Sequence, residues 1–293
     1  MPRDELGDNS DMVKGGGDIV SGNKDTLSGS SDVLGADFTP PGNWPNASNT
    51  GITVPVSSLT RWDGTYNTFT PGVTIENLEV FGDINTSKAD LVIRNCLVHG
   101  RIITSEAGTL NCHVYDCEID GGGTFGVSLI LGNGTLAERI NMHGHGNGVQ
   151  VEQNSGTIRD SWIHNLFPGG LPPDDEHTDG IQGGSLMSNF LMDHCSIQPN
   201  VSTGTSAINI WNENTPEQAH DITIQNSYLD GRGSAFVCYF PRFTGWSNIY
   251  CLNNLMRSSL ATGVPRYCDS SFNTTAFTGN IDAETGATIS TGQ

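Results

Sequence analysis

A six-residue phrase recurs along this chain, and it constrains the fold more than any other feature. The phrase reads apolar, any residue, Asn or Asp, small, any residue, apolar, as in Ile-Arg-Asn-Cys-Leu-Val at residues 93–98. Its third residue falls at positions 77, 95, 116, 141, 160, 194, 226 and 253, on average about 25 residues apart. The copy around Asn141 is the weakest, and the copy at 194 has His. Such an interval is typical of a solenoid rather than of a helix.

Each copy reads as a strand, a polar corner and a second strand. Parallel stacking would place every residue above its equivalent in the next coil, at the inter-strand spacing of ~4.8 Å. The corner amides are then expected to form a hydrogen-bonded ladder along the stack. The small residues after the corner are expected to point inward as core fillers, not as reactive thiols. They are Cys96, Cys117, Ser161, Cys195 and Ser227.

A second column of residues aligns independently of the corners. Its members are apolar and each follows Gly or Ala: Val127, Val149, Ile181, Ile208 and Phe236. Two columns with unequal but matching spacings indicate coils whose loops differ in length. The sequence therefore predicts an all-β fold, a single-stranded right-handed parallel β-helix, the hand being that favoured by parallel crossovers.

The N-terminal segment differs in composition from the rest of the chain. Its first 37 residues contain eight Asp and Glu against three Lys and Arg, among Gly, Ser and Asn. Such a segment buries too little apolar surface to order itself. We therefore expect an irregular acidic arm over residues 1–41, extended or ordered by a partner. The β-helix is expected over 42–285 and a C-terminal tail over 286–293.

Composition excludes several classes of protein. The chain has 13 Lys plus Arg against 32 Asp plus Glu, and no lysine follows Lys88. A net charge of -19 argues against nucleic-acid binding, which needs clustered cations. No apolar run is long enough to insert into a membrane, and the polar N-terminus does not resemble a signal peptide. Seven cysteines cannot all pair, so we expect assembly in a reducing cytoplasm.

Several segments are similar to those of a known family: His177-Thr178-Asp179-Gly180-Ile181-Gln182 above all, and the phrases at residues 50–55, 73–75 and 160–164. In these segments the chain resembles pectate-lyase-like right-handed β-helix proteins, found among secreted actinobacterial proteins and the minor tail proteins of their bacteriophages. The resemblance covers roughly residues 42 to 285. It implies the fold, and for spike-like members a homotrimer. It leaves the chemistry open, because this fold carries many functions.

One outward strip is a candidate glycan-binding surface. With Val149, Ile181 and Ile208 inward, strand alternation turns the next residues outward, and also those two positions further on. Amides bond sugar hydroxyls and aromatic rings cover the apolar face of a pyranose. The alternative is a plain solvent-facing sheet. The candidates are Gln150, Glu152, Gln182, Asn209, Trp211 and Tyr239.

A polar cluster near residue 177 contains the candidate catalytic residues. Asp175, His177 and Asp179 lie together after a Pro- and Gly-rich loop, and alignment places His145 beside His177 in the neighbouring coil. Paired carboxylates suit glycoside hydrolysis, and a base suits a lyase. Asp179 could instead satisfy backbone groups at a corner. Acid-rich loops bind calcium through oxygen ligands, so calcium is the candidate cofactor, with Asp174, Asp175 and Glu176 as its ligands.

Two functions from different classes follow. The first is a bacteriophage tail protein, made in the host cytoplasm and carried in the virion, whose arm contacts other tail subunits and whose β-helix contacts host cell-wall polysaccharide. The alternative is a secreted or virion-borne polysaccharide hydrolase or lyase; a surface adhesin without catalysis is a third. The absence of lysine after residue 88 removes a common cationic helper from lyase chemistry and favours recognition of neutral glycans.

Overall fold

The structure is a computed structural model. It describes residues 43–68, 70–151, 156–167, 178–184, 187–199, 206–211, 219–231, 234–239, 247–258 and 276–289. These ranges lie within one compact unit, Thr39–Gln293, and the predicted arm over residues 1–41 lies outside them. No helix in these ranges is both long and apolar enough to cross a membrane.

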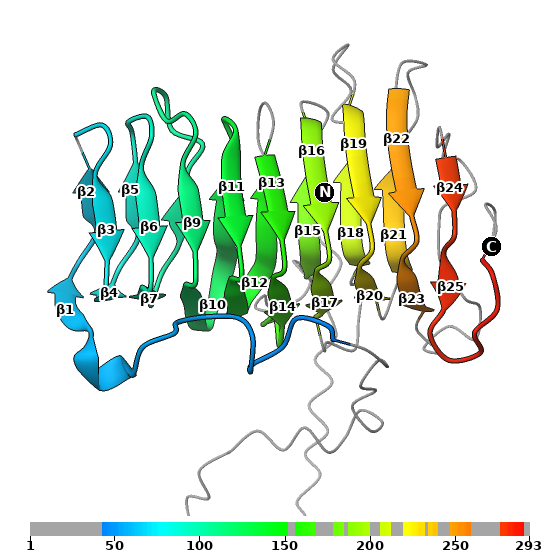
Figure 1. The fold of residues 1–293 in the computed structure, drawn as a ribbon, viewed down its shortest axis with the longest axis horizontal. Coiled ribbons are helices and arrows are strands. Elements are labelled where there is room, and N and C mark those ends of the chain that lie inside the picture. The colour runs from blue at the N-terminus through cyan, green and yellow to red at the C-terminus, as the bar shows by residue number, and fades with distance from the viewer. Residues whose placement is uncertain are drawn as a thin grey trace, which may run out of the picture. The chain divides into compact units, whose positions relative to one another are not determined.

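The chain forms a right-handed parallel β-helix with three strand-bearing faces, which confirms the predicted fold class (Figure 1). The 16-stranded sheet bends through β10 and β12 and so supplies two faces; the 9-stranded sheet supplies the third. Every pairing between named strands is parallel, as stacked coils require. A short 3-10 helix, η2 (Val56–Ser58), precedes the first strand.

The strands form three faces. Face 1 contains β1 (Thr60–Asp63), β4 (Leu78–Phe81), β7 (Leu97–Val98), the first parts of β10 (Glu118–Leu131) and β12 (Asn141–Val151), β14 (Trp162–His164), β17 (Ser196–Gln198), β20 (Tyr228–Gly231), β23 (Leu255–Ser258) and β25 (Ile281–Asp282). Face 2 contains β2 (Tyr66–Thr68), β5 (Ile84–Thr86), β8 (Ile102–Ile103), the second parts of β10 and β12, β15 (Asp179–Gly183), β18 (Ser206–Trp211) and β21 (Ser234–Tyr239). Face 3 contains β3 (Thr74–Glu76), β6 (Val92–Arg94), β9 (His113–Tyr115), β11 (Thr135–Glu138), β13 (Gly156–Arg159), β16 (Ser188–Asp193), β19 (His220–Gln225), β22 (Ser247–Leu252) and β24 (Ala276–Thr278).

The corner between faces 3 and 1 explains the repeating Asn or Asp. Seven of the eight predicted corner positions have a left-handed backbone with φ from 48° to 56°: Asn77, Asn95, Asp116, Asp160, His194, Asn226 and Asn253. Asn and Asp tolerate this conformation better than most residues. The prediction at Asn141 is wrong, because Arg139 occupies that corner with φ 53°. Its guanidinium holds Asp116 of the preceding coil by bonds of 2.6 and 3.1 Å.

The residue after each corner points into the core, as predicted. Cys96, Cys117, Ser161, Cys195 and Ser227 are all fully buried. Corner side chains of neighbouring coils bond in two places, Arg139 to Asp116 and His194 Nδ1 to Asp160 Oδ1 at 2.6 Å, and a further set of hydrogen bonds runs through the inward position. Cys195 N–H donates to Ser227 Oγ at 3.0 Å, and Ser227 N–H donates to the Oδ1 of Asn254 at 3.0 Å. These inward polar groups satisfy backbone N–H groups that the corner leaves without strand partners.

The second predicted column is confirmed for four of its five members. Val149, Ile181, Ile208 and Phe236 are Cα partners in successive coils of face 2. The predicted place of Val127 in this column is wrong, because Val127 pairs with Asn147 and the buried Leu129 pairs with Val149. The reason is local, because two register shifts in β10 between Asp120 and Val127 displace the alignment.

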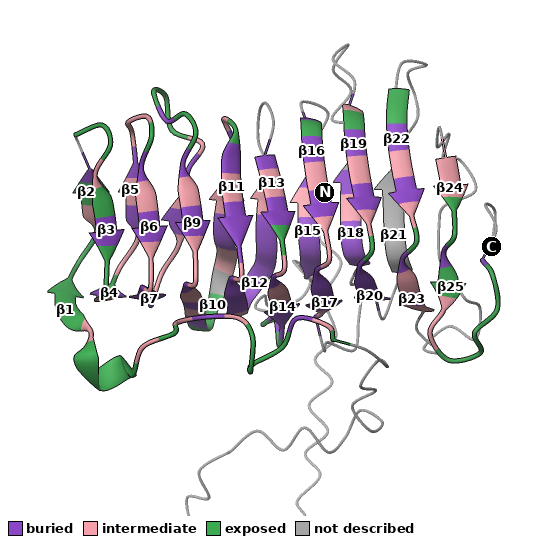
Figure 2. Cartoon of the chain, viewed as in Figure 1, coloured by how far each residue is buried: buried purple, intermediate pink, exposed green. Residues whose placement is uncertain are grey.

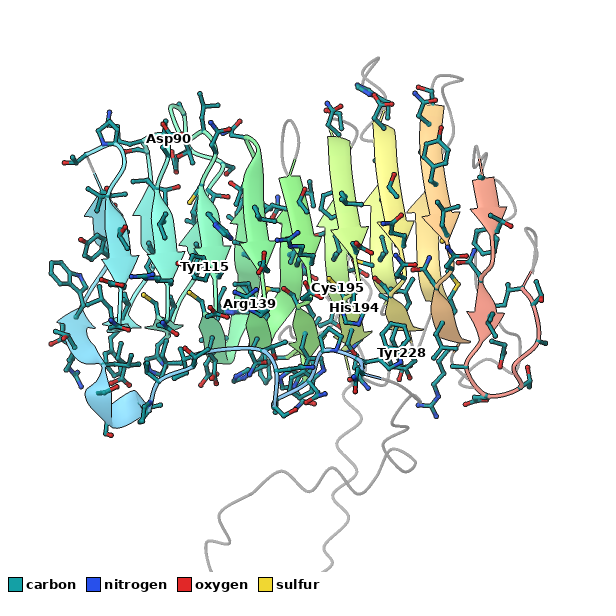
Figure 3. The ribbon with its side chains drawn as sticks, in the orientation of Figure 1. Asp90, Tyr115, Arg139, His194, Cys195 and Tyr228 are labelled. Atoms are coloured by element: carbon teal, nitrogen blue, oxygen red, sulfur yellow. The ribbon has the colours of Figure 1, made fainter. Side chains whose placement is uncertain are left out.

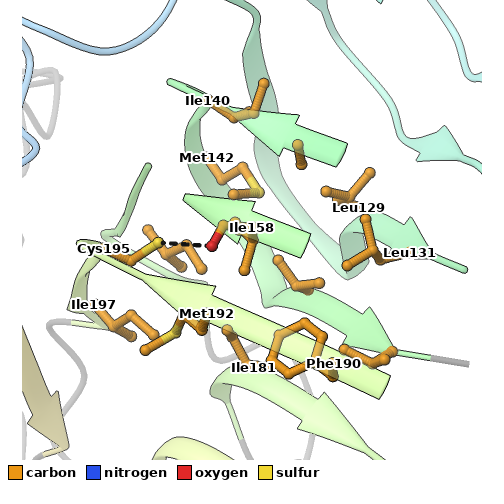
Figure 4. Close-up of a cluster of buried hydrophobic side chains, with 14 of the residues drawn as sticks. Leu129, Leu131, Ile140, Met142, Ile158, Ile181, Phe190, Met192, Cys195 and Ile197 are labelled. Carbon is orange, nitrogen blue, oxygen red and sulfur yellow. Dashed lines mark hydrogen bonds between the residues drawn. The ribbon is translucent and has the colours of Figure 1, made fainter. Parts of the chain in front are cut away.

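The inward columns from all three faces merge into one apolar core (Figure 2). In its middle, Ile181 of face 2, Phe190 and Met192 of face 3 and Ile197 of face 1 pack together (Figure 4). The Cys195 thiol lies 3.7 Å from the carbonyl oxygen of Ile158. Each coil therefore contributes a thin layer of core, and stability comes from stacking layers.

Residues 43–59 form what we call the axial strap, which runs along the stack beside the corner (Figure 1). Trp44 stacks on the ring of His194 with centroids 5.8 Å apart. Further contacts follow in order along the strap: Asn43 O lies 3.1 Å from His194 Nε2, Gly51 N–H donates to Arg139 O, and Thr53 N–H donates to Asn95 Oδ1. At the other end of the chain, Ile289 is buried and its N–H donates to Asn280 O, so the start of the predicted tail packs on the last coil.

Candidate functional site

Three of the predicted glycan-binding residues lie side by side on face 2. Gln150, Gln182 and Asn209 are Cα partners in three successive coils and are half-buried. We call them the amide strip. Two positions further on, Trp211 and Tyr239 are Cα partners whose side chains lie outside the described part of the structure, as does Glu152. The structure therefore brings the predicted amides together in one row.

Asp179 lies beneath the amide strip with 0% of its surface exposed. Its carboxylate accepts from Ser206 N–H at 3.1 Å and from Asn209 Nδ2 at 2.9 Å. Its own N–H donates to Asn147 Oδ1 at 2.7 Å, so three coils are joined through Asp179. This geometry matches the alternative in which Asp179 satisfies backbone groups. Its catalytic role stays a prediction.

His145 is also buried, with 3% exposed, at the irregular part of the β10–β12 pairing. Its Nδ1 lies 3.1 Å from Ser128 Oγ. Burial lowers the pKa of His145, and the positive charge of Arg101 lowers it further, so the imidazole is neutral near pH 7. The predicted partners Asp175 and His177 lie outside the described residues.

The predicted calcium ligands Asp174, Asp175 and Glu176 also lie outside the described residues. Across the ranges that the structure does describe, no group of three or more His, Cys, Asp or Glu side chains is arranged to hold a metal ion. The calcium site stays a prediction.

Face 3 presents charges that already neutralise one another. Outward residues of neighbouring strands pair across the coils, and Arg94 bonds both Glu76 and the hydroxyl of Tyr115, at 2.6 and 3.2 Å. Tyr115 is labelled in Figure 3. Further along the same face, Arg159 pairs with Glu138. Such cross-strand pairs stabilise a solvent-facing sheet and leave few charges for a ligand.

Face 1 carries an arrangement that the sequence analysis missed. Three histidines face outward, and each lies within hydrogen-bonding distance of a side chain in an earlier coil. The pairs are Glu79–His99 at 3.1 Å, Glu118–His143 at 3.1 Å and Asn141–His164 at 2.9 Å. Asp120 lies on the other side of the His143 ring, 3.5 Å from Nδ1. We call these seven residues the carboxylate–histidine ladder.

A signal for this ladder is present in the sequence. In three copies of the repeat, His directly follows a buried apolar residue, as in Val98-His99, Met142-His143 and Ile163-His164. Alternation along a strand turns that next residue outward. Apart from His164 and Asn141, the ladder is accessible, with 22% to 35% of each side chain exposed.

His164 closes the ladder and differs from its other histidines. It is 8% exposed, and the ring of Trp162 stacks on it with centroids 3.4 Å apart. Burial lowers the pKa of His164 to about 3, with a smaller contribution from His143. In the part of the chain that the structure describes, its Nδ1 is buried without a hydrogen-bond partner. A neutral imidazole with one unused acceptor therefore ends the ladder.

Comparison of the chain with models of known protein families, with curated proteins and with solved structures finds no match. The resemblance noted for residues 177–182 therefore stays a prediction. The amide strip and the ladder are the two candidate sites on the described surface.

Proposed function

We propose that the protein is a bacteriophage tail component, of the minor tail or tail-spike-like kind, whose β-helix contacts a host cell-surface glycan through face 2. The amide strip is the observation that carries this proposal. Gln150 and Gln182 lie at the coil spacing of ~4.8 Å, so they can bond hydroxyls of successive sugars, while Asn209 at the end of the strip holds Asp179. Trp211 and Tyr239, in register two positions on, would supply rings for the sugar faces.

Two further features support a tail protein. Four described cysteines, Cys96, Cys112, Cys117 and Cys195, are free and buried, which suits a protein folded in a reducing cytoplasm before particle assembly. The acidic segment of residues 1–41 would attach the β-helix to other tail subunits, and three copies would form a spike. Tail attachment and the trimer are part of the proposal.

Glycan contact is tested by titrating the full chain with host cell-wall polysaccharide. Replacing both Gln150 and Gln182 by Ala removes two sugar-bonding amides, each contributing about 0.5–1.5 kcal/mol, so we expect affinity to fall about tenfold. Thr223→Ala, on face 3, is the matched control and should bind as the unaltered protein does. Equal affinity in the double variant would refute contact through the amide strip.

Tail membership has its own test, since antibodies against the chain should label the tails of purified virions. Particles that lack the chain would refute that part of the proposal.

The described residues assigned to an enzyme, Asp179 and His145, are buried, so we do not propose catalysis. Release of reducing ends or unsaturated products in the same incubation would favour the enzyme instead.

A further inference from the structure

The accessible part of face 1 offers a ligand mainly hydrogen-bond acceptors. Glu79, Glu118 and Asp120 each place one carboxylate oxygen near a histidine. In the part of the chain that the structure describes, the second oxygen of each has no partner. Arg61, the Cα partner of Glu79, pairs with Asp63 instead. A ligand for this surface must therefore bring donors and positive charge.

His164 supplies an independent indication of a ligand. His143 directs Nε2 to Glu118 and Nδ1 to Asp120, both in the preceding coil. His164 directs Nε2 to Asn141 in the same way, and its ring lies beside that of His143, with centroids 5.1 Å apart. Among the described residues its Nδ1 has no hydrogen-bond partner, and a buried unpaired acceptor costs free energy until a donor reaches it.

We propose that the carboxylate–histidine ladder binds a glycan bearing free amino groups, an amino-sugar polymer lying along the axis of the stack. Ammonium groups would pair with Glu118 and Asp120 through charge-assisted hydrogen bonds, while hydroxyls donate to the remaining acceptors. The coil spacing of ~4.8 Å is close to the length of one sugar along a chain. The site lies on a different face from the amide strip and does not depend on it.

A sugar is favoured over a lysine-rich peptide because the acceptors recur at the coil spacing of ~4.8 Å, which matches a chain of sugars, whereas a lysine side chain is a flexible stem. The ring of Phe81 at the start of the ladder does not take part, because His99 stacks on it with centroids 4.5 Å apart and the Arg61 guanidinium lies over it, 4.0 Å from the ring centroid.

The experiment is calorimetric titration of the full chain at pH 6.5 and low salt, with a β-1,4-linked glucosamine hexamer as the probe. The fully N-acetylated hexamer is the matched ligand, because it lacks only the positive charges. We expect the glucosamine hexamer to bind at least tenfold more tightly. The double variant Glu118→Gln and Asp120→Asn should lose at least tenfold in affinity for it.

The matched control is Glu106→Gln, which removes one exposed carboxylate elsewhere and should bind as the unaltered protein does. If the double variant fails to fold, as judged by its circular dichroism, Asp120→Asn alone is used, because 35% of that side chain is exposed. Absence of binding, equal affinity for the acetylated hexamer or unchanged affinity in the variant would overturn the proposal. Tighter binding of a lysine hexamer would overturn it in favour of a peptide. None of these results bears on the Gln150 and Gln182 variant, so failure here is distinguishable from failure on face 2.

Discussion

Asp179 joins three coils of face 2, and its replacement tests whether that role is structural. Asp179→Ala removes the acceptor for Ser206 N–H and for Asn209 Nδ2, both of which the carboxylate now satisfies. A buried donor left without an acceptor costs about 1–3 kcal/mol. Ser206 N–H bears the full cost, whereas the half-buried Asn209 can reorient in part. We therefore expect the free energy of unfolding to fall by about 3 kcal/mol, a large share of the usual ~5–15 kcal/mol.

Asp179→Asn should be far milder. Its Oδ1 still accepts from Ser206, and its amide can donate to Asn209 if that side chain flips. The flip turns the Oδ1 of Asn209, which is buried and has no partner among the described residues, toward residue 179. The expected cost is about 1 kcal/mol.

Urea unfolding followed by circular dichroism measures both variants. For a slope of about 3 kcal/mol per M, Asp179→Ala should lower the midpoint by about 1 M and Asp179→Asn by about 0.3 M. A midpoint for Asp179→Ala equal to that of the unaltered protein would show that the carboxylate does not hold the coils together. An Asn variant as unstable as the Ala variant would refute the flip of Asn209.

Two other changes probe the stack. A Cβ at Gly180 would lie against the Ile197 side chain and 2.6 Å from Ala207 O, so Gly180→Ala should lower the free energy of unfolding in urea by about 1–3 kcal/mol. A Cβ at Gly184 meets nothing within 4 Å, so Gly184→Ala is the control and should change stability little. Because the pKa of His164 falls from 6.5 to about 3 on folding, the unfolded chain alone takes up this proton between these values. Stability should therefore decrease as pH falls below about 6.5, less steeply in His164→Gln; equal slopes would contradict this.

The two register predictions that failed show what sequence alone leaves open. The corner at Arg139 could not be found by looking for Asn or Asp, since its left-handed backbone is held by the ion pair with Asp116 in another coil. Val127 was misaligned because counting along the chain assumes regular alternation, and β10 shifts register after Asp120. Both errors come from contacts between coils, which local sequence does not encode.

The candidate sites differ in the same way. The amide strip was predictable because Gln150, Gln182 and Asn209 follow aligned core residues, so alternation fixed their direction. The ladder required knowing that Glu118 and His143, 25 residues apart, face each other across neighbouring coils. The burial of Asp179 likewise depends on Ser206 and Asn209 in the next coil.

The sequence by itself determined the coil, its corners and its inward columns, because each depends on residues close together in the chain: strand alternation, a left-handed corner and a small residue after it. The tertiary structure decided the register within β10, the path of the axial strap and the pairing of carboxylates with histidines. These features depend on which side chains meet between coils stacked ~4.8 Å apart. The residues that meet are separated in sequence by loops of unequal length, so counting along the chain does not pair them.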